Sequence, residues 1–167
     1  MLVLVVIFVL ILLYAWYIEP NRLQVSHQKV TASKQKSGSL RILFLSDLHI
    51  GYFTRSFFLR RKLARLLALH QQEPVDLIML GGDFIDRNPR YLDLLGQFLA
   101  QFAAFKVPVL AVLGNHDYKS FANEVAPLLS LFAAHEIQVL RNQSTVVATS
   151  KGEVLVVGID DLHQSAV

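Results

Sequence analysis

Three apolar runs, each followed by a polar turn that contains glycine, dominate the pattern of hydrophobic and polar positions after residue 40. The runs cover residues 40–46, 75–80 and 107–113. Short runs of this kind are typical of strands that are buried within a parallel sheet. We therefore expect three central strands, each of which ends in a polar turn.

Segments with the apolar spacing of helices separate these runs. Residues 57–71 show it most clearly, with apolar side chains at positions 58, 59, 63, 66, 67 and 69. A second helix is predicted after Pro89, since proline suits the first turn of a helix. A third is predicted over residues 120–134, where Pro127 either kinks the helix or marks a late start. Alternating strands and helices predict right-handed crossovers and a parallel sheet.

The rhythm changes in the last part of the chain. Residues 137–140, 144–148 and 154–157 have the pattern of short strands separated by polar turns. This pattern indicates a meander rather than further helix–strand units. We expect a second sheet that packs on the first.

The N-terminal residues 1–18 are apolar and carry no charge. About 20 such residues span the core of a bilayer, so this stretch lies at the short end of the range. Tyr14, Trp16 and Tyr17 gather at one end, as residues of an aromatic belt do. We therefore predict an uncleaved transmembrane helix. The alternatives are a buried core helix and a cleaved signal peptide, although no basic residue precedes the run and no small-residue cleavage site follows it.

Residues 19–39 are predicted to form a basic linker. Between positions 19 and 41 the sequence holds one acid and five basic residues, namely Arg22, Lys29, Lys34, Lys36 and Arg41. By the positive-inside rule, this bias predicts that residues 40–167 lie on the cytoplasmic side of the inner (cytoplasmic) membrane, behind a single span. The basic residues would attract anionic headgroups, or form a solvated linker, and the two interpretations are compatible.

Composition narrows the chemistry that this chain can carry. The 167 residues are enough for one domain, 53% of them are hydrophobic, and none is cysteine. Any metal must therefore be bound by carboxylate, amide and imidazole groups, which favour Mn, Fe, Zn or Mg. The formal charge of +3 is too small to indicate a nucleic-acid partner. No glycine-rich nucleotide-binding motif follows any predicted strand, which disfavours a nucleotide-binding module.

The three polar turns contain the side chains that are best suited to bind a metal or to catalyse a reaction. Asp47 and His49 follow the first strand, Asp83 follows the second, and Asn115 and His116 follow the third. Each residue by itself has an ordinary explanation as a helix cap, a turn residue or a hydrogen-bonded histidine. Because the carboxyl ends of parallel strands meet at one edge of a sheet, we expect all five side chains to lie together and form a metal site.

These residue types suit a two-metal hydrolytic site. Asp47 and His49 are two apart, so an extended backbone would direct both toward one cation. Asp83 could bridge two cations through its two oxygens, and Asn115 could bind the second cation through its amide oxygen. His116 is suited to protonating a leaving group, with Asp83 as its orienting partner. Two ions about 3.5–4 Å apart support in-line displacement at phosphorus, which predicts hydrolysis of a phosphate ester or anhydride.

The motifs in these turns resemble a known family. Residues 46–51 (SDLHIG), 81–86 (GGDFID) and 114–118 (GNHDY) are similar, in order and spacing, to the first three motifs of the calcineurin-like metallophosphoesterases. The resemblance implies an α/β fold with a four-layer β-sandwich flanked by helices, and a hydrolase that uses two divalent metal ions. It implies Asp47 and His49 at the first metal, a bridging Asp83, Asn115 at the second metal, and catalysis by His116.

An apolar N-terminus before such a domain resembles one branch of the family in particular. That branch contains membrane-associated phosphodiesterases and UDP-2,3-diacylglucosamine hydrolases of lipid A synthesis. We expect a phosphorylated small molecule or lipid as substrate, with the predicted anchor favouring a lipid, and the membrane as a partner. The sequence leaves three substrate classes open, namely a lipid-linked pyrophosphate, a nucleotide diester and a phosphoprotein.

The chain also departs from the family pattern. Family members carry further histidines downstream, two of them in a Gly-His-x-His motif that this sequence does not contain. We therefore expect residues 40–167 to be the N-terminal part of a metallophosphoesterase domain, with weak cation binding by itself. The alternative is a truncated, catalytically inactive fragment tethered to the membrane. An in-frame Gly-His-x-His beyond Val167 in the gene would favour the enzyme.

Overall fold

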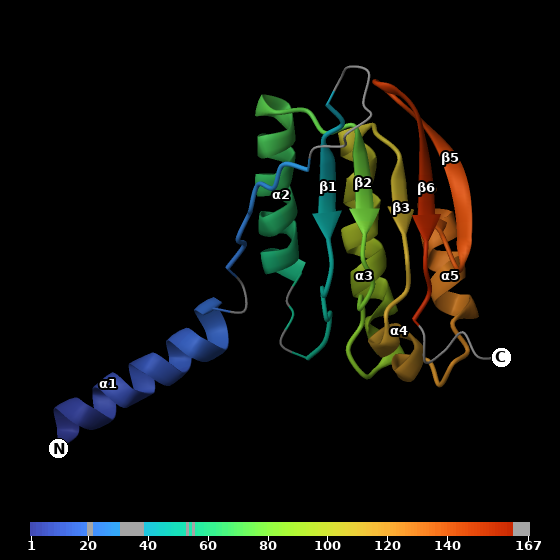
Figure 1. Ribbon diagram of the computed structural model, residues 1–167. Coiled ribbons are helices and arrows are strands. Elements are labelled where there is room, and N and C mark those ends of the chain that lie inside the picture. The colour runs from blue at the N-terminus through green and yellow to red at the C-terminus, as the bar shows by residue number, and fades with distance from the viewer. Residues whose placement is uncertain (20–21, 31–38, 53, 55, 162–167) are drawn as a thin grey trace. The chain divides into compact units, whose positions relative to one another are not determined.

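A four-stranded parallel sheet forms the centre of the fold, as a computed structural model shows (Figure 1). The structure describes residues 1–19, 22–30, 39–52, 54 and 56–161. The strands follow one another in the order of the chain and are β1 (Ile42–Leu45), β2 (Leu77–Leu80), β3 (Val109–Ala111) and β4 (Gln138–Val139). All three pairings are parallel, which confirms the predicted parallel sheet and its three central strands.

Helices cover one face of this sheet (Figure 1). They are α2 (Ser56–Gln72), the short 3-10 helix η3 (Pro89–Tyr91) continuing into α3 (Leu92–Leu99) and η4 (Ala100–Phe105), and α5 (Ala126–Ala134). The short helix α4 (Asn115–Ser120) lies instead at the carboxyl ends of the strands (Figure 1). The apolar positions of the covering helices are buried as the helical spacing predicts, among them Leu59, Leu63, Leu66, Leu95, Phe98 and Phe132. Burial of each such side chain contributes about 1.5–3 kcal/mol, so this layer supplies much of the stability.

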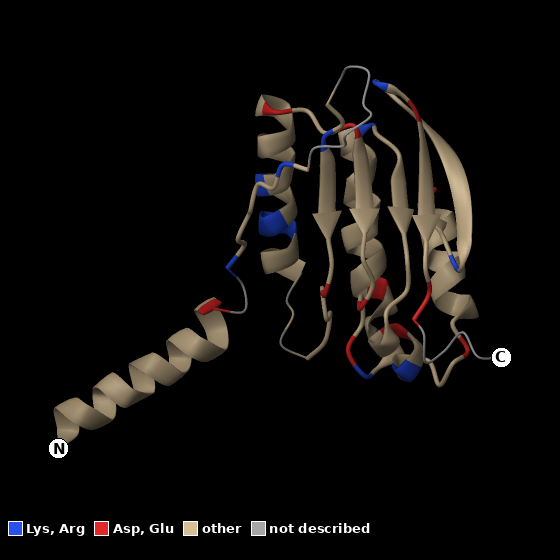
Figure 2. Cartoon of the chain, in the orientation of Figure 1, with Lys and Arg blue, Asp and Glu red and all other residues tan. Residues whose placement is uncertain are grey.

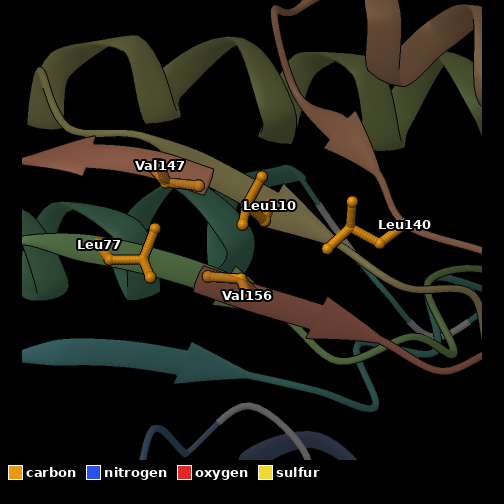
Figure 3. Packing of buried hydrophobic residues seen from close by; sticks show 5 residues of the cluster. All are labelled: Leu77, Leu110, Leu140, Val147 and Val156. Atoms are coloured by element: carbon orange, nitrogen blue, oxygen red, sulfur yellow. The ribbon is translucent and has the colours of Figure 1, made fainter. Parts of the chain in front are cut away.

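An antiparallel hairpin covers the other face of the sheet. Its strands are β5 (Gln143–Thr149) and β6 (Gly152–Gly158). Val147 and Val156 of the hairpin face Leu77, Leu110 and Leu140, and the five side chains form one buried cluster (Figure 3). This confirms the second sheet that the late strands predict. The described residues therefore form three layers, namely helices, parallel sheet and hairpin. The four-layer β-sandwich stays a prediction.

The fourth strand differs from the prediction of a meander. β4 joins the parallel sheet beside β3, with Leu110 opposite Gln138 and the Leu140 N–H donating to the Ala111 carbonyl at 2.8 Å. The strand is short, and its alternation of polar and apolar residues does not indicate which of the two sheets it joins. Its place follows from α5, which returns the chain to the start of the parallel sheet as a crossover helix does.

The predicted helix over residues 120–134 is wrong at its start. Two helices occupy the region, because α4 already begins at Asn115 and α5 begins at Ala126. Pro127 lies in the first turn of α5, so it marks a late start and does not kink a longer helix. Residues 114–117, predicted as a loop, are instead the N-cap and first turn of α4.

The N-terminal residues form a unit of their own, Met1–Gln35, distinct from the unit Lys36–Val167. Helix α1 (Leu2–Leu13) continues into a π-helical turn, η1 (Tyr14–Ile18). No helix among the described residues is long and apolar enough to cross a membrane, so the predicted transmembrane helix over residues 1–18 has no support here. Much of the predicted linker, at positions 20–21 and 31–38, lies outside the described residues.

Asp76 ties the hairpin to the sheet at the N-terminal ends of the strands. Its carboxylate is buried, accepts the backbone N–H of Arg41 at 2.9 Å, and accepts the hydroxyl of Ser150 in the β5–β6 turn. Burial by itself raises the pKa of Asp76, but these two hydrogen bonds and the nearby cations of Lys151 and Arg41 outweigh it and lower the pKa. The charged form of Asp76 therefore stabilises the folded state.

We predict that Asp76→Asn lowers the free energy of unfolding by about 1–3 kcal/mol at neutral pH, since one buried acceptor is lost. Because the folded pKa of Asp76 is lower than the ordinary value of 3.8, the contribution is present above that value and disappears as pH falls through the folded pKa. Urea denaturation of both proteins at neutral and acidic pH measures the difference. Glu153→Gln, an exposed carboxylate on the hairpin, is the control and should change stability by less than about 0.5 kcal/mol. A difference for Asp76→Asn that does not shrink in acid contradicts the prediction.

Candidate metal centre

The polar turns after β1 and β2 stay paired beyond the ends of the strands. The backbone N–H of Asp47 donates to the Gly82 carbonyl at 3.1 Å, and that of His49 donates to the Asp83 carbonyl at 2.9 Å. A parallel bridge between Ile50 and Ile85 continues the contact. Figure 2 shows acidic residues at this end of the sheet, where the strand arrows point. The backbone therefore holds the predicted site residues of two strands side by side.

Asp47, His49 and Asp83 form one cluster of potential metal ligands. His49 Nε2 lies 3.8 Å from Asp47 Oδ1 and 3.7 Å from Asp83 Oδ2, and one ligand atom from each residue lies within 4.8 Å of the others. Two atoms that bind one ion at about 2.1 Å are at most about 4.2 Å apart, so both distances from His49 fit a shared ion. Oxygen and imidazole donors also suit a divalent ion. The expected convergence of these three residues is thus present in the fold.

The backbone reaches this arrangement through left-handed residues, not through the extended conformation predicted for Asp47 and His49. The φ angles are 57° at Asp47, 41° at His49 and 56° at Asp83. Aspartate, asparagine and histidine adopt this region more readily than other residues that carry a Cβ. Concentrations of such angles are characteristic of functional sites, where the surrounding structure maintains them.

Two glycines bring the turn after β3 into contact with the turn after β2. A Cβ on Gly114 would lie 2.1 Å from Asp83 Oδ1 and 2.6 Å from the Asp83 nitrogen, and one on Gly82 would lie 2.6 Å from the Gly114 nitrogen. The φ of Gly114 is −104°, which any residue adopts, so this glycine is needed for the close approach and not for a sharp turn. Position 82 needs glycine both for the close approach and because its φ is 90°, a conformation that residues with a Cβ rarely adopt.

His116 contacts the cluster through its backbone and its ring. Its backbone N–H donates to Asp83 Oδ1 at 3.0 Å, and its ring lies edge-on to that of His49 with 4.7 Å between centroids. Ring atom Nδ1 lies 3.4 Å from Asp86 Oδ1. The residue that faces the imidazole is therefore Asp86, where the sequence led us to expect Asp83.

Asp86 is a further candidate site residue, which the sequence analysis did not single out. Together with His49 and His116 it forms a second group whose ligand atoms lie within 4.8 Å of one another. The sequence did contain a signal for Asp86, because this residue ends the GGDFID motif three residues after Asp83. A left-handed Arg87 follows it, with φ 62°.

Asn115 lies beside these residues at the start of α4 and is partly exposed. It is the chain neighbour of His116, whose N–H bonds to Asp83. Among the hydrogen bonds of the described residues, none involves the Asn115 side chain. Its role as a ligand of a second metal stays a prediction.

A buried carboxylate, that of Asp117, links the turns behind the cluster. It has no exposed surface and accepts four backbone N–H groups, those of Asp83, Phe84, Ile85 and Gly114. Burial raises the pKa of Asp117 and the nearby charge of Asp83 adds to this rise, while the backbone hydrogen bonds act in the opposite direction. No role for Asp117 was predicted from the sequence.

A second polar network anchors α4 from its other side. The Tyr118 hydroxyl donates to Asp160 Oδ2, and Arg141 Nε donates to both the Tyr118 oxygen and Asp160 Oδ2 at 3.1 Å. Burial, with the Asp160 hydrogen bond, raises the pKa of Tyr118 to about 12. The network therefore keeps a neutral phenol in place and connects the helix that carries His116 to the segment after β6.

Comparison with known proteins agrees with this geometry. The family model described as calcineurin-like phosphoesterase matches residues 40–162. The chain belongs to this family. The resemblance of the three motifs is thereby confirmed, and with it an α/β phosphoesterase fold whose members generally bind divalent metals.

Three bacterial proteins are among the relatives of this calcineurin-like phosphoesterase. The uncharacterized metallophosphoesterase YkoQ of Bacillus subtilis is 30% identical over 146 residues, covering 86% of this chain and 50% of YkoQ. The phosphodiesterase YaeI of Escherichia coli is 28% identical over 158 residues, covering 89% and 54%. The UDP-2,3-diacylglucosamine pyrophosphatase LpxG of Chlamydia trachomatis is 30% identical over 118 residues, covering 68% and 34%. The chain spans about half the length of YkoQ and YaeI.

We predict that Gly114→Ala lowers the free energy of unfolding of this phosphoesterase by about 1–3 kcal/mol, because the added methyl group would overlap the backbone and carboxylate of Asp83. Gly51→Ala is the matched control. A Cβ there would meet nothing closer than 3.4 Å, so the change should stay within about 0.5 kcal/mol. Urea denaturation compares the two, and equal stabilities would show that the turns do not need the close approach.

Proposed function

We propose that this chain hydrolyses a phosphate ester or pyrophosphate bond with the help of two divalent metal ions. The observation that carries the proposal is the meeting of Asp47, His49 and Asp83, from two strand ends, within 4.8 Å. Family membership supports the hydrolase class, and relatives are named as a phosphodiesterase and a pyrophosphatase. Because the chain spans about half of the curated relatives it matches first, its own activity is a proposal.

The residues divide between two ions in our proposal. Asp47 and His49 would hold the first ion, Asp83 would bridge, and Asn115 would hold the second. Their oxygen and nitrogen donors are compatible with Mn, Fe, Zn or Mg. When bound, such ions supply Lewis acidity and an activated water. Asp83 suits the bridging position, since its side chain is 17% exposed and so shielded from solvent, compared with 66% for Asp47.

His116 would act on the leaving group. Nδ1 faces the Asp86 carboxylate at 3.4 Å, an arrangement that favours a proton on Nδ1 and orients the ring. With Nδ1 facing Asp86, the imidazolium form of His116 would donate a hydrogen bond or a proton from Nε2 to the leaving oxygen. The side chain is 34% exposed, so a substrate can reach it.

We further propose a membrane-associated substrate, either a phosphorylated lipid or a small molecule, at the cytoplasmic face of the inner membrane. Residues 1–18 carry no charge, and the described apolar side chains among them are exposed. Several basic residues follow, which would favour anionic headgroups. The relative LpxG is named for a pyrophosphatase activity on UDP-2,3-diacylglucosamine.

We predict that Asp83→Asn lowers Mn²⁺-dependent hydrolysis of bis(p-nitrophenyl) phosphate more than about 100-fold, since residues outside the metal's own ligands already cost 10–100-fold when changed. Initial rates with and without EDTA measure the loss. Glu153→Gln, which removes one exposed carboxylate from the hairpin, should leave the rate unchanged.

Two outcomes of this experiment would count against the proposal. A rate of the unchanged chain no higher than the uncatalysed background would favour the non-catalytic alternative, and an active Asp83→Asn would reject the bridging role. The same assay with UDP-2,3-diacylglucosamine tests the substrate class, because a higher kcat/KM for the simple diester contradicts a lipid substrate.

We predict that His116→Ala lowers kcat by about 10²–10⁴-fold, as loss of a general acid does, without weakening Mn²⁺ binding. Binding should persist because His116 holds Asp83 through its backbone N–H, which alanine retains. Isothermal titration with Mn²⁺ and steady-state kinetics separate the two effects. Loss of Mn²⁺ affinity in this variant would make His116 a metal ligand instead, with His49 and Asp86.

A further inference from the structure

Asp117 accepts hydrogen bonds from two turns that approach each other from different strands. Oδ2 accepts the N–H of Asp83 at 2.9 Å and that of Gly114 at 3.0 Å. Oδ1 accepts the N–H of Phe84 at 2.8 Å and that of Ile85 at 3.2 Å. The two oxygens of one carboxylate thus satisfy the turn after β2 and the turn after β3 together.

An ionised carboxylate suits this position better than any other side chain of its size. It accepts on both oxygens and donates nothing, and hydrogen bonds to a charged acceptor are stronger than those between neutral groups. Asparagine has nearly the same shape but only one acceptor oxygen, and its NH₂ group would face backbone N–H donors. Asp117→Asn therefore leaves at least two buried N–H groups without a partner.

Asp83 is consequently held at three points. Its N–H donates to Asp117, its carbonyl accepts from the His49 N–H at 2.9 Å, and its Oδ1 accepts from the His116 N–H at 3.0 Å. The left-handed backbone of Asp83, with φ 56°, needs such restraint to persist. The contact with Asp117 is the one that also fixes Gly114, and through it the start of α4.

We propose that Asp117 is a positioning residue that sets the affinity of the site for divalent metal ions without touching them. It does so by holding the Asp83 carboxylate at a constant distance from His49 and from the first turn of α4. This inference rests on the metal site proposed above. It assigns to the last residue of Gly-Asn-His-Asp a role in metal affinity that acts through the backbone of another strand.

Asp76 offers a matched control at the opposite end of β2. It is also a buried aspartate, and it also joins two distant segments by accepting a backbone N–H and a hydroxyl. Asp76→Asn should therefore lower stability in a comparable way. It should not disturb the candidate metal centre, because its partners lie at the N-terminal ends of the strands.

The test compares Mn²⁺ binding by the unchanged chain, Asp117→Asn, Asp76→Asn and Asp83→Asn in isothermal titration. We expect Asp117→Asn to weaken binding by about 10–100-fold, the range found for residues that orient metal ligands. Asp76→Asn should stay within about threefold of the unchanged chain, and Asp83→Asn should abolish binding. Equal affinity for Asp117→Asn and the unchanged chain overturns the inference, as does equal weakening by Asp117→Asn and Asp76→Asn, which would reduce Asp117 to a general structural role.

Amide hydrogen exchange of the metal-free protein provides a second measurement. The N–H groups of Asp83, Phe84 and Ile85 should exchange faster in Asp117→Asn than in Asp76→Asn, and unchanged exchange overturns the inference. If Asp117→Asn shows no cooperative unfolding, the titration is repeated with Asp117→Glu, which keeps the negative charge but displaces it. This variant should weaken Mn²⁺ binding more than about tenfold. Absence of Mn²⁺ binding by the unchanged chain is a different result, since it rejects the metal site itself.

Discussion

The candidate metal centre depends on the close contact between the turns after β2 and β3. Gly82 and Gly114 approach so closely that neither position has room for a Cβ. The carboxylate of Asp117 is buried and accepts hydrogen bonds from both turns. A buried charge is unfavourable unless its oxygens are satisfied, and here each oxygen accepts two N–H groups. One side chain thereby satisfies the irregular backbone of two strand ends.

The residues at the two ends of the parallel sheet have different roles. At the N-terminal ends, Asp76 joins the sheet to the hairpin by accepting the Arg41 backbone N–H and the Ser150 hydroxyl. At the carboxyl ends, several residues adopt left-handed backbone conformations, each of which costs of order 1–3 kcal/mol when unsupported. The helices on one face and the hairpin on the other supply the buried apolar area that offsets this cost. The packed layers therefore supply the stability, and the candidate metal ligands gather at the carboxyl edge of the sheet.

The main elements of the fold could be predicted because their signals are local. Apolar runs located β1, β2 and β3, and helical spacing located α2. Pro127 predicted either a kink or a late start, and the late start is the one that α5 shows. The start of α4 was missed because its N-terminal turn is held by Asp117, and three of the four backbone N–H groups that Asp117 accepts lie more than 30 residues away. The place of β4 was missed for the same kind of reason, since two residues carry too little pattern to choose between sheets.

The sequence by itself determined the chemistry that is available: no thiolates, five carboxylate, amide or imidazole side chains, and their delivery by three successive strand ends. These properties follow from residue types and from spacing along the chain. Only the tertiary structure decided which atoms meet. It placed Asp86, rather than Asp83, against the His116 ring, and it buried Asp117 between two turns. The direction of each side chain depends on left-handed backbone angles and on contacts between distant segments. Neither can be predicted from the pattern of hydrophobic and polar residues along the chain.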